Sequence, residues 1–65
     1  MIKLTTLSGN EFYLNTELVY KVEALADTVI TLVDGKTLRV TESPEVIIDR
    51  IVQYKRKIYV GNLEV

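Results

Sequence analysis

The chain has 65 residues, of which 48% are apolar, and a formal net charge of −1. This length excludes a second domain, and the balanced charge argues against nucleic acid as the main partner. The chain has neither Cys nor His, which excludes disulfides and argues against a zinc site. A domain this small buries only roughly 60% of its unfolded surface, so association is the remaining source of stability and we expect a homo-oligomer.

The start of the chain carries no basic segment leading into an apolar run, and its apolar runs are too short to cross a bilayer. We therefore expect a cytoplasmic protein without a transmembrane segment.

Two short strands are predicted first. Residues 2–7 alternate apolar with polar side chains, with an irregularity at Thr5-Thr6 before Leu7. Turn-forming residues follow at 8–10, and residues 10–14 alternate again. This order predicts an antiparallel hairpin.

A third strand is expected after a turn at residues 15–17. Every second side chain from 18 to 24 is apolar, which is the alternation of a half-buried strand. The side chains expected to face the core are Leu18, Tyr20, Val22 and Ala24.

The β-branched run 28–33 ends at Asp34-Gly35, a strong hairpin signal. A two-residue loop would place Ile30 opposite Arg39, whereas a three-residue loop ending at Gly35 would place it opposite Leu38. We favour the second because it keeps the apolar faces together.

This fourth strand is apolar on both sides. With Ile30 facing inward, Val29 and Val33 point away from that face. They require a second cover, which is either curvature of the sheet into a small, partly open barrel or a neighbouring subunit.

A helix is predicted over residues 44–58, because Ser43 can cap its free N–H groups and Pro44 fits the first helical position. Its apolar side chains spread over roughly 160°, wider than the roughly 100° that one sheet covers. Ile48 and Val52 lie at one side of this arc, so either a partner subunit contacts them or a curved sheet covers the whole arc. Gly61-Asn62 is a stop signal, after which the tail frays or adds a strand.

The predicted fold is therefore α+β, with about five short antiparallel strands in a curved sheet or small barrel, followed by one amphipathic C-terminal helix.

Few residues suggest chemistry. The carboxylates are scattered over turns and solvent faces, so we expect no catalytic, cofactor-binding or metal-binding residue and no enzyme activity. Asp27 and Asp34 lack calcium-loop spacing and are interpreted as turn formers whose side chains bond locally.

One charge cluster stands out, at Lys55, Arg56 and Lys57 between Tyr54 and Tyr59. Such clusters can stack and hold RNA, or dock on an acidic protein surface. We favour a structural interpretation, in which the cations lie in the last helical turn and complement the helix dipole. These three residues, with Ile48 and Val52, form the candidate interface.

Three stretches, at residues 7–15, 23–36 and 40–43 before a helix ending in Tyr54-Lys55-Arg56, carry a family resemblance. Together they resemble the short FlbD-type flagellar proteins, also called SwrD swarming-motility proteins, from Met1 to about Ile58. The string Asp-Thr-x-Ile-Thr-Leu-x-Asp-Gly-Lys is the most specific part. Ala26 departs from the expected Pro, and residues 19–21 are less typical.

The resemblance implies a small cytoplasmic bacterial protein that supports flagellar motor power through the stator, and it brings no catalytic or ligand residues. We therefore expect residues 1–65 to form one FlbD-like interaction domain that binds copies of itself and flagellar motor or stator components. The alternative is a small RNA-binding translational regulator with the architecture of the carbon-storage-regulator proteins. That alternative rests on architecture alone, because none of their strand motifs occurs in this chain.

Overall fold

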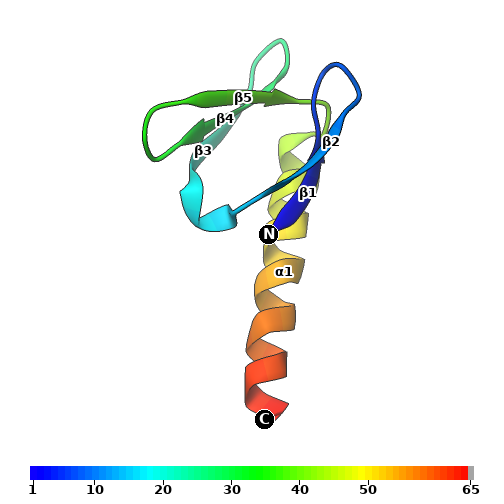
Figure 1. Ribbon diagram of the computed structural model, residues 1–65, viewed down its shortest axis with the longest axis vertical. Helices are drawn as coiled ribbons and strands as arrows, with labels where there is room; N and C mark the ends of the chain where they lie inside the picture. Colours follow the sequence, from blue (N-terminus) through cyan, green and yellow to red (C-terminus); the bar gives the residue numbers. More distant parts are fainter. Residues whose placement is uncertain (65) are drawn as a thin grey trace.

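The computed structural model describes the backbone of residues 1–64 and the side chains of residues 1–58. In this part of the chain, two small antiparallel sheets precede one long helix, which confirms the predicted α+β class. The elements are β1 (Ile2–Thr5), β2 (Glu11–Leu14), the 3₁₀ turn η1 (Thr16–Leu18), β3 (Val19–Ala24), β4 (Thr28–Leu32), β5 (Thr37–Val40) and α1 (Pro44–Glu64). The sheets pack against one side of the first turns of α1, and the rest of the helix extends away from them (Figure 1).

Strands β1 and β2 form the predicted hairpin, with Ile2 opposite Leu14 and Leu4 opposite Phe12. The prediction that Leu7 continues the first strand is wrong. The chain turns at Thr6, whose N–H donates to the carbonyl of Asn10 at 2.8 Å, and Leu7 lies exposed in that turn.

Strands β3, β4 and β5 form the second sheet in that order. The predicted register at the β4–β5 turn is confirmed, since Ile30 lies opposite Leu38. The N–H of Leu32 donates to the carbonyl of Lys36 at 2.8 Å, which closes a three-residue loop. Gly35 ends this loop with a φ of 91°, a conformation that residues with a Cβ seldom adopt.

A bulge in β3 overturns part of the predicted alternation. Val19 pairs with Leu32 and Lys21 with Thr31, so Tyr20 is an extra residue without a partner on β4. Val19 and Val22 consequently pack against the core. Tyr20 is exposed at the bulge, and two more of the four side chains predicted to face inward are exposed for other reasons: Leu18 lies in η1 before the strand begins, and Ala24 is the last residue of β3.

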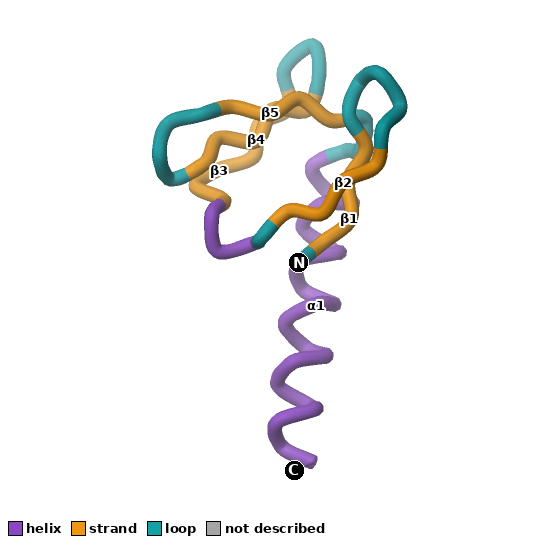
Figure 2. The backbone as a smooth tube through the Cα atoms, viewed as in Figure 1, coloured by secondary structure: helices purple, strands orange, loops and turns teal. Residues whose placement is uncertain are grey.

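The two sheets meet at one corner without closing into a barrel. Thr6 forms an isolated antiparallel bridge with Val40, and the N–H of Thr41 donates to the carbonyl of Thr5 at 3.0 Å. Figure 2 shows the two sets of strands joined there and separate elsewhere. Of the two predicted shapes, a curved arrangement of open sheets is therefore the one observed.

The core lies between the two sheets and the first turns of α1. Its buried side chains come from four strands and the helix: Ile2, Leu4, Leu14, Ile30, Val40 and Ile47. Val29 is also buried, although it points to the other side of β4 from Ile30. Glu23 and Arg39 lie directly opposite it on the neighbouring strands, so their side chains flank it on that face. Val33, by contrast, lies exposed beyond the end of β4.

Helix α1 begins as predicted. The N–H of Val46 donates to the Ser43 hydroxyl at 3.3 Å, and Pro44 is the first helical residue. The predicted stop at Gly61-Asn62 is wrong, because the helix runs to Glu64. One glycine inside a helix costs only about 1 kcal/mol relative to alanine and does not have to end it. The strand predicted through Leu63 is absent, and Val65 lies outside the described residues.

Candidate interaction surface

The apolar arc of α1 is only partly covered by the sheets. Ile47 is fully buried, and Ile51 and Tyr54 pack against the core. Ile48 and Val52, in contrast, are 56% and 40% exposed. Of the two alternatives for this arc, the one in which a curved sheet covers the whole arc is therefore wrong for the residues that the structure describes. Whether a partner subunit covers Ile48 and Val52 stays a prediction.

The basic cluster lies further along the same helix. Lys55, Arg56 and Lys57 are all exposed, in the part of α1 that extends beyond the sheets. The helix continues to Glu64, so these cations do not lie in its last turn and the predicted dipole role is wrong. Tyr54 packs against the core, which removes one of the two aromatic rings that could stack on bases, and the side chain of Tyr59 lies outside the described residues.

The two turn aspartates have different roles. Asp34 Oδ1 accepts the N–H of Lys36 at 3.0 Å, the local bond that was predicted. Asp27 instead accepts from the Arg39 guanidinium at 3.4 Å, twelve residues along the chain on β5. Within the described residues, no three acidic side chains gather in a group that could hold a metal ion.

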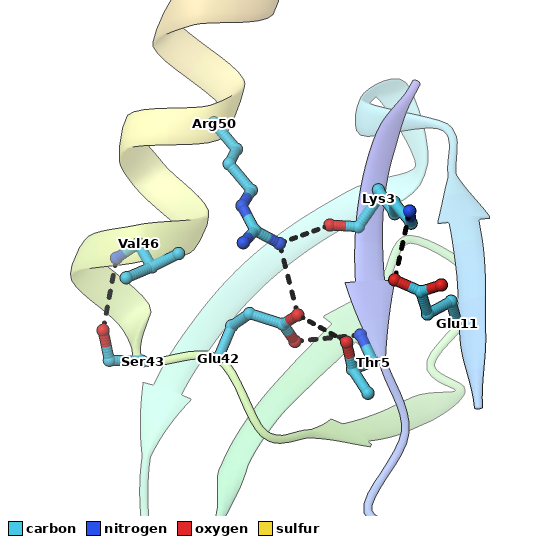
Figure 3. Close-up of polar contacts among 7 residues, drawn as sticks. All are labelled: Lys3, Thr5, Glu11, Glu42, Ser43, Val46 and Arg50. Atoms are coloured by element: carbon cyan, nitrogen blue, oxygen red, sulfur yellow. Dashed lines mark hydrogen bonds and ion pairs between the residues drawn. The ribbon is translucent and has the colours of Figure 1, made fainter. Parts of the chain in front are cut away.

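The best-connected polar group is the Glu42 carboxylate, just before α1 (Figure 3). It accepts both the N–H and the hydroxyl of Thr5 at 2.9 Å, and Arg50 Nη1 lies 3.2 Å away. The same Nη1 donates to the carbonyl of Lys3 at 2.6 Å. These bonds fasten strand β1 to the start of the helix.

This environment sets the protonation state of Glu42. Burial alone would raise the pKa of its carboxyl group, but the bonds from the Thr5 N–H and hydroxyl and from Arg50 outweigh burial and hold the pKa below 4.5. The Glu42 side chain is therefore a structural anion at neutral pH. Sequence reasoning missed this cluster, because Thr5 and Glu42 lie 37 positions apart in the chain.

An open pocket of about 420 Å³ lies where the β3–β4 turn approaches the start of α1. Leu7, Leu25 and Pro44 contribute to its walls, and its one charged wall residue, Asp27, is already paired with Arg39. It presents no converging set of ionisable groups for catalysis.

The family model of the flagellar and swarming motility proteins called FlbD matches residues 1–59. The chain belongs to the FlbD family. No curated protein and no solved structure matches the chain. The FlbD match covers both sheets and α1 as far as Tyr59, so it includes all five candidate interface residues.

Membership of the FlbD family points to a role in flagellar or swarming motility. It gives no support to the RNA-binding alternative. No helix in the described part of this FlbD protein combines the length and apolar character that crossing a bilayer requires.

Proposed function

We propose that this FlbD-family domain is a non-catalytic, cytoplasmic interaction module that supports the flagellar motor by docking on a motor component, with the stator as the favoured partner. The observation that carries the proposal is the match of the FlbD family model to residues 1–59. Self-association through α1 is part of the same proposal.

The surface of α1 supports docking on a protein. Beyond Tyr54 the helix leaves the sheets and presents Lys55, Arg56 and Lys57 to solvent. An exposed helix with apolar and basic residues fits a groove with an acidic rim, a common mode of helix recognition. Electrostatic attraction of this kind chiefly speeds association and selects the partner.

The absence of catalysis is also part of the proposal. Several carboxylates of the described residues engage in structural pairs, such as Glu42 with Arg50 and Asp27 with Arg39. Neither the open pocket nor the Glu42 cluster combines a nucleophile, a general base and a place for a substrate.

Charge reversal at the basic helix segment tests the docking proposal. In a motile host that carries this gene, the double variant K55E/K57E should reduce swarm-zone diameter and the torque of tethered cells, with flagellar number unchanged. The purified variant should also lose binding to the cytoplasmic part of the stator, and native binding should weaken with rising salt.

The matched control is K21E/K36E. It changes the net charge by the same amount as K55E/K57E, but the changes lie on the second sheet and in its β4–β5 loop. Lys21 and Lys36 make only exposed ion pairs, with Glu23 and Asp34, which contribute little to stability. Equal motility loss in both variants, or native torque in K55E/K57E, would reject docking through this segment. Binding of short RNAs that falls steeply with salt would revive the regulator alternative.

A further inference from the structure

Helix α1 carries an exposed apolar line beside its buried face. Ile48 and Val52, four residues apart, lie about 40° from each other around the helix. The sheets cover the neighbouring line of Ile47, Ile51 and Tyr54, and none of the core contacts includes Ile48 or Val52. Two adjacent β-branched side chains, each at least 40% exposed, favour a second helix packed along this line.

The charges next to this line are arranged by sign. Glu45, Asp49 and Arg56 lie within about 40° of one another, on the side of Val52 away from the core. Among the residues whose side chains the structure describes, no ion pair includes any of these three. Glu45 and Asp49, four residues apart, also repel each other mildly within the chain. The flank is thus acidic before Val52 and basic after it.

We propose that α1 pairs antiparallel with α1 of a second copy, with Val52 close to the two-fold axis. In an antiparallel pair related by a two-fold axis, the same flank of both helices meets. Asp49 lies about 4.5 Å before Val52 along the helix axis and Arg56 about 6 Å after it. Each Asp49 therefore meets Arg56 of the partner subunit, and the pair forms twice.

The orientation follows from these signs. In a parallel pair related by a two-fold axis, opposite flanks of the two helices meet, so neither Asp49 would lie beside Arg56 of the partner subunit and both attractions would be lost. An occupant with uniform charge would satisfy only half of the flank. A second copy of this chain, running the other way, satisfies both halves.

The proposal deepens the self-association part of the proposed function and rests on it. One line of contact between two helices buries less than the roughly 1,600 Å² of a standard interface. We therefore expect a weak dimer, with a dissociation constant on the order of 10 µM.

Sedimentation equilibrium of the full chain tests the geometry through charge reversal. D49R and R56D each turn two attractions into two repulsions, and each should raise the dissociation constant about tenfold at low salt. Mixing the two variants should restore the native constant, because every contact then joins opposite charges. The double variant D49R/R56D should also have the native dissociation constant, because its contacts again join opposite charges.

Two controls carry the same changes of charge outside the helix. Glu17 and Lys36 lie exposed in η1 and the β4–β5 loop, so E17R and K36D should leave the constant within about twofold, and circular dichroism should show native helix in every variant. A native chain that stays monomeric at about 1 mM would overturn self-association itself. A native dimer that neither variant weakens, or whose weakened variants are not rescued by mixing, would overturn the antiparallel pairing while leaving self-association intact.

Discussion

Replacing Glu42 with Gln tests how much the polar cluster contributes to stability. The carboxylate accepts two bonds from Thr5 and one from Arg50, and its side chain is only 10% exposed. Gln has nearly the same shape but presents a donor where one of these donors now points. The Thr5 hydroxyl can reverse its role, whereas the backbone N–H and the guanidinium cannot.

The expected loss is about 2–3 kcal/mol, since hydrogen bonds to charged groups contribute roughly 1.5–3 kcal/mol and an unpaired buried donor costs a similar amount. A domain of this length has a total stability of about 3–10 kcal/mol. The loss should therefore lower the Tm by about 10–20 °C. Urea unfolding followed by circular dichroism measures it, with E17Q as the exposed control.

The pH dependence gives an independent test of the same residue. Folding holds the pKa of Glu42 below its unfolded value, which is near 4.5. Ionised Glu42 therefore stabilises the fold at pH values above the unfolded pKa, and this contribution is lost as the pH falls through the folded pKa. The gap between native protein and E42Q should be widest near pH 7 and should narrow in acid. A gap under about 0.5 kcal/mol at pH 7, or one independent of pH, would refute the reasoning.

Two further predictions concern the second sheet. Gly35→Ala should lower the free energy of unfolding by about 1–2 kcal/mol through the positive φ alone, because nothing lies within 4 Å of the added Cβ. Gly35→Asn should lower it less, and thermal melts compare the two variants. Tyr20→Ala should change stability by less than about 0.5 kcal/mol, whereas Val22→Ala should cost about 1–2 kcal/mol in urea unfolding. Equal costs at these two positions would contradict the bulge.

Turn chemistry and apolar patterning were enough to predict the β4–β5 register and the helix start. At Asp34-Gly35, two local signals agreed, namely a turn type that needs a left-handed glycine and a register that pairs Ile30 with Leu38. The start of α1 is likewise determined locally, because the Ser43 hydroxyl accepts the N–H of Val46 three residues later.

The missed features depend on contacts between distant segments. Strict alternation along β3 could not reveal the bulge at Tyr20. Tyr20 is an extra residue only because Val19 and Lys21 pair with consecutive residues of β4. Glu42 meets Thr5 across 37 positions of sequence, so no local pattern joins them. The width of the apolar arc follows from helix geometry alone, but it left open whether a curved sheet covers Ile48 and Val52, and only the structure shows that both are exposed.

The division of α1 between a covered and an uncovered part has a consequence for how the sequence can vary. Up to Tyr54, side chains on the inner line must fit the volume of the core, so most substitutions there act on folding. From Lys55 to Ile58 that demand ends, and a substitution alters the exposed surface of the helix without altering the core. A change in the 55–58 segment can therefore alter the surface charge of α1 while the packing of the domain stays the same.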